Sequence, residues 1–273
     1  ANGVNIDRIF DNFEQERATG FMGVPTIFQM LVDHPRWQTT DLSSWKKACS
    51  GGAVVPPSLL KSVQARGVPM LQMFSLTESS AAGTVLPSHD AFRKVGSAGI
   101  PINHGSLKIA DDDDILLKGP QVMKEYWNNP DATAAALRGG WLHTGDLGYV
   151  DDEGYLYVVD RKKDMLISGG LNVYPAELER LITTVLGVVE VAVVGVPDER
   201  WGETPLVILF TNGVKVESND VLQVCKDNLA DFKLPRFLHI SDTPLPRNMS
   251  GKILKRELKA QFADFPKTAT PIR

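Results

Sequence analysis

The chain has 273 residues, of which 43% are hydrophobic and 23% are charged, a composition typical of globular proteins and unlike that of disordered or collagen-like chains. Its length favours about two domains. The 29 Lys and Arg residues against 33 Asp and Glu residues give a formal net charge of −4, which is too balanced for a chain that binds nucleic acid or a membrane surface as a whole.

The sequence contains no sign of a membrane span or an export signal. No apolar run reaches the roughly 20 residues of a membrane helix, and the first residues lack the basic and apolar regions of a signal peptide. The two cysteines, Cys49 and Cys225, have neither CxxC nor metal-ligand spacing and are interpreted as buried thiols of a reducing compartment. We therefore expect a cytoplasmic protein without a transmembrane segment.

Residues 1–85 alternate helix and strand signals. Prolines open two predicted helices, one from Pro25 and one from Pro56, and apolar residues follow each at helical spacing. Short apolar runs at 45–49 and 69–74 predict strands that end in small or polar residues. Strands of a layered α/β sheet deliver loops to a ligand crevice in this way. This stretch predicts an α/β layer whose sheet needs further strands.

Residues 96–160 favour a small β-rich subdomain. The predicted strands cover 106–109, 115–117, 147–150 and 155–159. The sequence Asp151-Asp152-Glu153-Gly154 predicts a hairpin turn between the last two strands.

A third pattern begins after the charged connector 161–164. Pro175 opens an amphipathic helix that we expect Gly187 to end, and Ser218 is predicted to cap a helix over 218–229. The other predicted elements are strands over 188–196, 206–210 and 237–240 and a last helix over 253–262. They predict a compact α+β domain over residues 164–273, which follows a partial, larger N-terminal domain over residues 1–163.

Two segments of the larger domain carry signals that packing alone does not require. In Phe74-Ser75-Leu76-Thr77-Glu78, the aromatic ring can stack on a purine, the Thr77 hydroxyl can bind a phosphate, and Glu78 can hold Mg²⁺. In Thr144-Gly145-Asp146, the carboxylate can accept both hydroxyls of a ribose, with Arg161 as a nearby donor. Taken alone, each segment is also compatible with ordinary core, turn and surface residues.

Two further segments lie in the predicted α+β domain. The pair Gly169-Gly170 lacks side chains, so a ligand or another backbone can approach it closely. Lys252 follows the polar loop 246–251 and precedes an apolar helix, where an ammonium group can reach phosphoryl charge. Residues 226–273 carry ten Lys and Arg against five Asp and Glu, which suits a phosphate-bearing ligand or an ordinary solvated basic face.

In this order and at these spacings, the four segments resemble the superfamily of adenylate-forming enzymes, which includes acyl-CoA synthetases, aryl-CoA ligases, firefly luciferase and peptide-synthetase adenylation domains. The similarity spans essentially the whole chain. It is strongest to fatty-acyl and aryl-CoA ligases, through Thr144-Gly145-Asp146, the connector 160–164 and the segment 248–252. The resemblance implies an ATP-dependent acid–thiol ligase that forms acyl-AMP from ATP and a carboxylic acid and then transfers the acyl group to coenzyme A.

The resemblance also implies roles for residues of the larger domain. Thr77 and Glu78 would contact phosphate and Mg²⁺, and Asp146 would hold the ribose together with Arg161. Segments that wall the adenine and acyl pockets in the family match Gly51, Gly52 and Ala53, the helix around Phe21 to Phe28, and the pair Phe74 and Ser75.

The smaller domain is expected to swing about a hinge between the two half-reactions. Lys163 matches the hinge position. Gly169 and Gly170 match the loop beside the pantetheine tunnel. Lys252 matches the lysine that bridges the carboxylate and the α-phosphate during adenylation.

The sequence departs from the family pattern in two ways. Phe74 and Ser75 replace the usual Tyr-Gly pair, so a bulkier residue faces the acyl pocket. No segment matches the loop that grips the β- and γ-phosphates, so we expect a fragment or a truncated relative that is inactive by itself. The alternative function is a non-catalytic nucleotide- or CoA-binding module of the same family. A luciferase-like or carrier-loading relative is less favoured, and homo-oligomerisation is left open.

Overall fold

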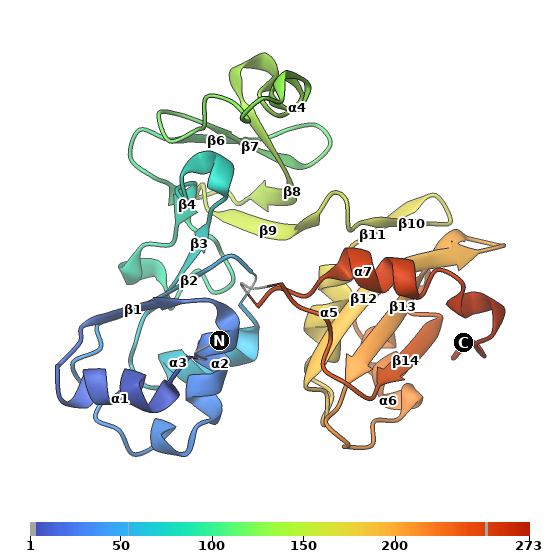
Figure 1. The fold of residues 1–273 in the computed structure, drawn as a ribbon, viewed down its shortest axis with the longest axis horizontal. Helices are drawn as coiled ribbons and strands as arrows, with labels where there is room; N and C mark the ends of the chain where they lie inside the picture. Colours follow the sequence, from blue (N-terminus) through green and yellow to red (C-terminus); the bar gives the residue numbers. More distant parts are fainter. Residues whose placement is uncertain (1–3, 54, 249–250) are drawn as a thin grey trace. The chain divides into compact units, whose positions relative to one another are not determined.

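The computed structural model of the protein describes residues 4–53, 55–248 and 251–273, and Figure 1 shows its fold. The chain forms two compact units, Ala1–Val158 and Val159–Arg273. Both units combine helices with β-sheets, which confirms the predicted α/β and α+β fold class. Within the described residues, no helix is both long and apolar enough to cross a membrane.

The first unit begins with a largely parallel sheet. Strands β1 (Gly20–Gly23), β2 (Lys47–Gly51) and β3 (Met70–Phe74) are parallel neighbours, and the short antiparallel strands β4 (Thr84–Val85) and β5 (Ile100–Pro101) continue the sheet. The helices of this region are α1 (Ile6–Glu14), α2 (Pro25–Asp33) and α3 (Pro57–Gln64). They contribute to one apolar core, in which Phe13 stacks on Trp45 at 4.6 Å between ring centroids.

Prolines set the helix starts of this unit as predicted. Pro25 is the first residue of α2, and Pro57 is the first residue of α3, with Pro56 as the N-cap. The helix expected around Phe21 to Phe28 is wrong in its first part, because Phe21 belongs to strand β1. In the described residues β1 pairs only with β2, so the prediction of further strands beyond β1 stays open.

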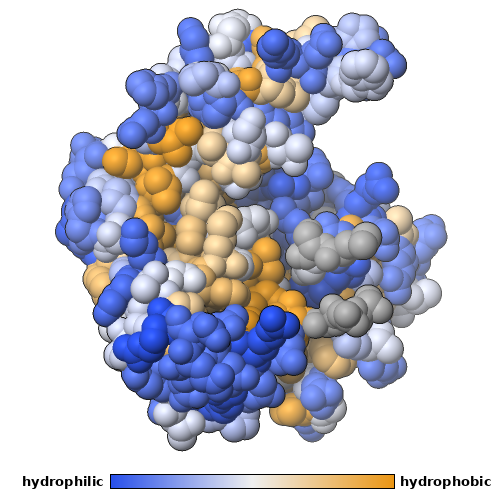
Figure 2. Space-filling view, turned by 60° about the vertical axis from the view of Figure 1, so that its left-hand side comes forward, coloured by the Kyte–Doolittle hydropathy of each residue, from blue (hydrophilic) through white to orange (hydrophobic). Residues whose placement is uncertain are grey.

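Some apolar side chains of the first unit remain exposed. Met22 in β1 is 64% exposed and Met30 in α2 is 46% exposed. Figure 2 shows hydrophobic residues gathered over part of one face of the molecule. Contiguous exposed apolar patches are typical of surfaces that contact a ligand or another polypeptide segment, whereas apolar residues exposed singly are common in soluble domains.

The second sheet of this unit confirms the predicted β-rich subdomain. Its antiparallel strands are β6 (Ser106–Ile109), β7 (Asp114–Lys118), β8 (Leu142–Val150) and β9 (Leu156–Arg161), and helix α4 (Pro130–Ala136) precedes β8. The predicted turn lies between β8 and β9, where Asp151 N donates to Tyr155 O at 3.0 Å. Strand β8 begins five residues earlier than the predicted start at 147.

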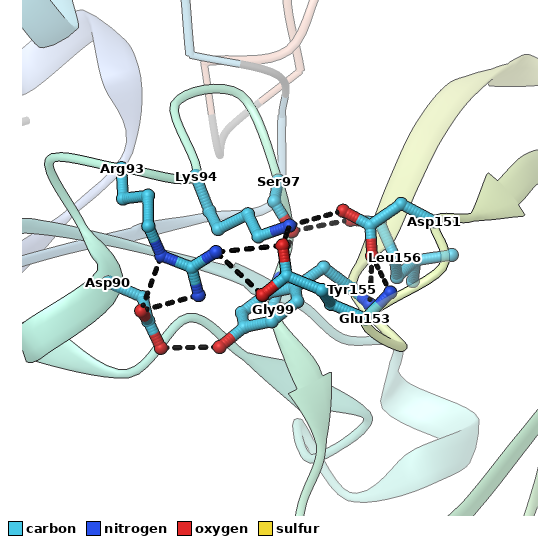
Figure 3. Close-up of polar contacts among 9 residues, drawn as sticks. All are labelled: Asp90, Arg93, Lys94, Ser97, Gly99, Asp151, Glu153, Tyr155 and Leu156. Carbon is cyan, nitrogen blue, oxygen red and sulfur yellow. Dashed lines mark hydrogen bonds and ion pairs between the residues drawn. The ribbon is translucent and has the colours of Figure 1, made fainter.

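A charged network holds the 88–94 segment to the β8–β9 hairpin, as Figure 3 shows. Its members are Asp90, Arg93, Lys94, Asp151, Glu153 and Tyr155. Lys94 is 9% exposed, and its Nζ lies 2.7 Å from Asp151 Oδ2 and 2.5 Å from Glu153 Oε1. The bonds from Lys94 are the first cause that lowers the pKa of each of these two carboxyls.

Close backbone packing lies next to this network. Ser97 Oγ donates to Leu156 O at 2.9 Å and accepts from Gly99 N at 2.9 Å (Figure 3). Gly99 has a φ of +85°, and an ideal Cβ at this position would lie 2.0 Å from the Val85 carbonyl carbon. Only glycine fits here without movement of strand β4.

The second unit is built on one mixed sheet with helices on both faces. Its strands are β10 (Leu166–Ser168), β11 (Leu171–Val173), β12 (Glu190–Asp198), β13 (Gly202–Phe210) and β14 (Phe237–Ser241). The helices are α5 (Pro175–Ile182), α6 (Ser218–Lys226) and α7 (Lys255–Gln261). Strand β12 is buried on both faces, since Val191 and Val193 join one apolar cluster while Ala192 and Val194 join another.

All three helices of this unit differ from the predictions at a boundary: α6 ends at Lys226 and not at 229, and α7 spans Lys255–Gln261 and not 253–262. Helix α5 ends at Ile182 and not near Gly187, and the hydroxyls of Thr183 and Thr184 donate to carbonyls three residues back. Such bonds compete with helix continuation. Ser218 does not cap α6: it is the first helical residue, and Glu217 is the N-cap without a side-chain hydrogen bond.

The two thiols differ in burial. Cys225 is buried as predicted, and its burial raises the pKa of the thiol to about 11. Cys49 is only partly buried, and its burial also raises the thiol pKa.

Candidate functional site

The carboxyl ends of the three parallel strands meet at one edge of the first sheet. Gly23 of β1 pairs with Ser50, and Gly51 of β2 pairs with Met73 of β3. An ideal Cβ on Gly51 would lie 3.3 Å from Met73 O, a tight contact that a side chain could make only with a small shift of β3. The predicted segments Gly51-Gly52-Ala53 and 74–78 therefore leave neighbouring strands at the edge where α/β sheets bind ligands.

Phe74 ends strand β3 inside an apolar cluster. It is 7% exposed and shares that cluster with Ile115, Leu117, Leu142 and Leu156 of the second sheet. The observed role of Phe74 is thus to join the two sheets of the unit, and stacking on a purine stays a prediction. Ser75, the next residue, is half-buried.

Thr77 and Glu78 lie in a short 3-10 helix, Thr77–Ser79, that follows β3. Thr77 is exposed and Glu78 is half-buried. Glu78 Oε1 accepts a hydrogen bond of 2.8 Å from the Tyr126 hydroxyl, and Glu78 O accepts one of 2.8 Å from Met123 N. Burial and the bond to Glu78 both raise the pKa of Tyr126. Tyr126 could not be identified from the sequence, because it is distant from Glu78 along the chain and belongs to no local motif.

Asp146 lies in a bulge of strand β8. Asp114 of β7 pairs with Leu147, whereas Leu116 pairs with His143. The two paired positions are therefore four residues apart on β8 but only two residues apart on β7. We call residues 144–146 the TGD bulge. A bulge changes the direction of side chains beside a regular ladder and is frequent next to functional sites.

Thr144 fixes one side of the TGD bulge. Its Oγ1 donates to Ile115 O at 2.7 Å and accepts from Asp146 N at 3.1 Å. Asp146 is 6% exposed. Because Ile115 also packs with Phe74, the structure connects the TGD bulge to the end of β3 through one apolar cluster.

The remaining predicted residues belong to the second unit, whose boundary at Val159 falls within strand β9. Arg161 is the last residue of β9 and is half-buried, and Lys163 is exposed in the turn that follows. The neighbouring Asp160 is 7% exposed and accepts hydrogen bonds from Arg161 N at 2.7 Å and Ala176 N at 2.8 Å. Its burial raises the pKa of the carboxyl. Asp160 thus ties the end of β9 to the first turn of α5.

Gly169 and Gly170 form the two-residue turn of the β10–β11 hairpin. Their φ angles are +60° and +83°, which glycine adopts without strain and which suit such a tight hairpin. Gly169 N donates to Trp201 O at 2.8 Å, and an ideal Cβ on Gly169 would lie 2.6 Å from Trp201 Cε3. No atom lies within 4 Å of the corresponding position on Gly170. Trp201 belongs to no sequence motif: it directly precedes β13, and the pairing of Ser168 with Gly202 brings it to Gly169.

Lys252 lies in a loop that is anchored to the start of β12. Lys252 N donates to Asn248 Oδ1 at 2.9 Å, and Asn248 N donates to Lys252 O at 2.9 Å. Arg247 donates to Gly251 O at 2.6 Å and pairs with Glu190 at 2.9 Å. Lys252 is half-buried. Met249 and Ser250 of the predicted motif lie outside the described residues.

Metal ligands do not cluster in the part of the chain that the structure describes. No group of three or more His, Cys, Asp and Glu side chains there has the arrangement of a metal site. Mg²⁺ commonly binds through one or two carboxylates, with waters and substrate phosphates as its other ligands. Glu78, a half-buried carboxylate with one oxygen oriented by Tyr126, is compatible with that mode.

Two family models match this chain. The model described as AMP-binding enzyme matches residues 2–127, and the model described as AMP-binding enzyme C-terminal domain matches residues 177–252. The chain belongs to the AMP-binding enzyme family. This confirms the predicted adenylate-forming superfamily. The segments 51–53 and 74–78 lie within the first match and Lys252 ends the second, while Asp146 and Arg161 lie between them.

Individual members of the AMP-binding family are similar over nearly the whole chain. An indoleacetate–CoA ligase of Aromatoleum aromaticum is 43% identical over 95% of this chain and 53% of its own length. A long-chain-fatty-acid–CoA ligase of Mycobacterium tuberculosis is 40% identical over 95% of this chain and 54% of its own length.

The fold also matches a solved structure of this family. The o-succinylbenzoate CoA synthetase of Bacillus subtilis, in complex with the acyl-adenylate intermediate OSB-AMP, superimposes with a TM-score of 0.85 and 34% identity, over 94% of this chain and 54% of that chain. The chain spans about half the length of the relatives that it matches.

Proposed function

We propose that the protein is an AMP-forming acid–thiol ligase, which converts ATP and a carboxylic acid into acyl-AMP and pyrophosphate and then transfers the acyl group to coenzyme A. The observation that carries this proposal is the similarity to indoleacetate–CoA and fatty-acid–CoA ligases over 95% of the chain. The motif residues also lie at or next to strand ends, bulges and turns, which are the usual positions of ligand-binding residues in α/β folds.

In the first half-reaction, the acid's carboxylate attacks the α-phosphorus of ATP and pyrophosphate leaves. Asp146 accepts the ribose hydroxyls and Arg161 donates to the ribose. Thr77 binds phosphate, and Glu78 would hold Mg²⁺, which would neutralise phosphate charge. Lys252 bridges the attacking carboxylate and the α-phosphate. Catalysis of phosphoryl transfer is largely positioning and charge stabilisation, and these residue types suit that task.

The adenine and acyl pockets lie at the carboxyl edge of the parallel sheet in this proposal. Gly51, Gly52 and Ala53 wall the adenine and acyl pockets, and Phe74 contributes an aromatic edge. Ser75 stands where the family usually has glycine, so its side chain narrows the acyl pocket. We therefore expect a preference for acids without bulky substituents next to the carboxyl group.

In the second half-reaction, the thiol of coenzyme A attacks the acyl carbonyl and AMP leaves. The unit that contains Lys252 then has to turn about a hinge at Lys163, so that the Gly169-Gly170 turn lines the pantetheine tunnel. The turn is suited to this role because an ideal Cβ at Gly170 would meet no atom within 4 Å. The proposed domains are 1–163 and 164–273.

The proposal is tested with the intact protein, ATP, Mg²⁺ and a panel of aryl, indolyl and fatty acids, by measurement of pyrophosphate release and then of acyl-CoA. We expect release with some acids and acyl-CoA only when coenzyme A is added. Lys252→Ala should lower the rate of acyl-AMP formation about 10²–10³-fold and affect conversion of supplied acyl-AMP far less.

Lys267→Ala is the matched control, because Lys267 is an exposed lysine of the same unit that pairs with the similarly exposed Asp264 at 2.7 Å. It should keep the wild-type rate. Nucleotide binding without pyrophosphate release for any acid would favour the alternative, a non-catalytic nucleotide- or CoA-binding module.

A further inference from the structure

A buried carboxylate lies directly beside the TGD bulge and has no role in the function proposed above. Asp114, the first residue of strand β7, is 2% exposed. A carboxylate at such depth requires hydrogen-bond donors, since an unpaired buried charge is costly. Its partners therefore show what this residue holds in place.

Both partners of the Asp114 side chain come from β8. Asp114 Oδ1 accepts from Gly145 N at 3.0 Å, and Oδ2 lies 3.0 Å from His143 Nδ1. An ionised carboxylate only accepts, so the contact with His143 is a hydrogen bond when Nδ1 carries the proton. Arg138 Nη2 lies 3.1 Å from the same ring nitrogen, but it cannot donate to Nδ1 while Nδ1 carries that proton. One oxygen of Asp114 thus binds Gly145 at the centre of the bulge, and the other contacts His143, the residue before the bulge.

The bulge depends on this acceptor because its central N–H cannot join the ladder. The pairing between β7 and β8 is interrupted there, and Gly145 has a φ of +70°. Thr144 fixes the bulge through Ile115 O, on one side of Gly145, and Asp114 fixes it at Gly145 itself. Without Asp114 the Gly145 N–H loses its partner, and the backbone that leads into Asp146 is free to take another path.

We propose that Asp114 is a positioning residue for nucleotide recognition: it holds the TGD bulge so that the Asp146 carboxylate meets the ribose hydroxyls. The inference rests on the proposed function, in which Asp146 binds the ribose. Asp114 itself touches no substrate. His143 binds its second oxygen and keeps the carboxylate oriented toward Gly145.

The test measures the preference of the intact protein for ATP over 2′-deoxy-ATP, from the dissociation constants of both nucleotides. Asp146→Ala should abolish the preference. Asp114→Ala should lower it about three- to tenfold, the effect of one ordinary hydrogen bond. Asp114→Asn keeps an oxygen that accepts from Gly145 N–H and should restore most of it.

Asp90→Ala is the matched control. Asp90 is also a buried carboxylate of the first unit, at 6% exposure, but it binds Arg93 and Tyr155 (Figure 3). Its loss should lower stability and leave the ribose preference unchanged. An equal loss of preference in Asp90→Ala, or an unchanged preference in Asp114→Ala, overturns the role of Asp114 alone. A wild-type protein without nucleotide binding overturns the proposed function as well.

Hydrogen exchange of the Gly145 amide gives a second measurement, and its decisive result comes from the wild-type protein. The Gly145 amide should exchange slowly in the wild-type protein, because it is bonded to a buried carboxylate. Asp114→Asn should stay protected at this amide. Exchange of Gly145 in the wild-type protein at the rate of an open loop would refute the bond on which the inference depends.

Discussion

The glycine pair of the β10–β11 turn provides a sharp comparison, because its two members have similar backbones and different surroundings. Gly169→Ala and Gly170→Ala both place a side chain at positive φ, +60° and +83°. This strain costs about 1–2 kcal/mol in either variant. Both substitutions also reduce the entropy of the unfolded chain, by about 0.4–1 kcal/mol, so this effect cancels in the comparison.

The surroundings distinguish the two sites. The new Cβ of Gly169→Ala would lie 2.6 Å from Trp201 Cε3, whereas that of Gly170→Ala meets nothing within 4 Å. Two hydrogen bonds hold the backbone of Trp201: its backbone N–H donates to Asp198 Oδ1 at 2.9 Å, and its carbonyl accepts from Gly169 N at 2.8 Å. Moving its ring away costs about 1–3 kcal/mol, the usual range for overpacking.

We therefore expect Gly169→Ala to lower the free energy of unfolding by about 1–3 kcal/mol more than Gly170→Ala does. Urea denaturation followed by tryptophan fluorescence measures the difference. In half-reaction assays, Gly169→Ala should slow thioester formation and spare acyl-AMP formation, and Gly169→Trp should block thioester formation. Equal destabilisation by the two alanine variants would refute the packing of Trp201 on Gly169. Unchanged thioester formation in Gly169→Trp would refute the tunnel assignment.

Three further substitutions test other contacts. Tyr126→Phe removes the hydroxyl that orients Glu78, so the Mg²⁺ concentration for half-maximal pyrophosphate release should rise about three- to tenfold; an unchanged Mg²⁺ dependence would contradict the metal role. Gly99→Ala puts a Cβ 2.0 Å from the backbone of β4. Thermal unfolding should show a loss of more than about 3 kcal/mol in the free energy of unfolding, the size expected for severe overpacking and strain. A loss below about 1 kcal/mol would show that β4 can move to accommodate the methyl group. Lys94 lowers the pKa of the Asp151 and Glu153 carboxyls. A carboxyl with a lowered pKa in the folded protein stabilises it above the unfolded-state pKa near 4, and this stabilisation is lost as the pH falls. The stability of the wild-type protein should therefore fall between about pH 5 and pH 3, and that of Lys94→Met should fall less.

Local signals in the sequence predicted much of the fold. The strand predicted over 106–109 is β6, and the helices predicted from Pro25 and Pro175 begin at those residues as α2 and α5. These predictions succeed because proline at a helix start and an apolar run bounded by turn residues act within a few residues. The Ser218 cap fails for a related reason: a serine near a helix start fits both the cap position and the first turn.

Contacts between distant strands could not be predicted in this way. The start of β8 was missed because the TGD bulge interrupts the alternation that marks a strand, and its position depends on pairing with β7. The bond between Asp114 and Gly145, the neighbour of Asp146, and the bond between Tyr126 and Glu78 join residues that only the folded chain brings together. The sequence motifs indicated the residues that we propose to meet the nucleotide, and the structure adds contacts that hold two of these segments.

The most direct test of the central claim follows the oxygen atoms of the acid. The intact protein is incubated with ATP, Mg²⁺, coenzyme A and an ¹⁸O-labelled carboxylic acid that supports pyrophosphate release, and the products are analysed by mass spectrometry. Attack of the carboxylate on the α-phosphorus leaves one acid oxygen on AMP after the acyl group is transferred. For this mechanism we expect one ¹⁸O atom in AMP and none in pyrophosphate. Formation of ADP with the label in inorganic phosphate, or acyl-CoA with unlabelled AMP, would contradict it.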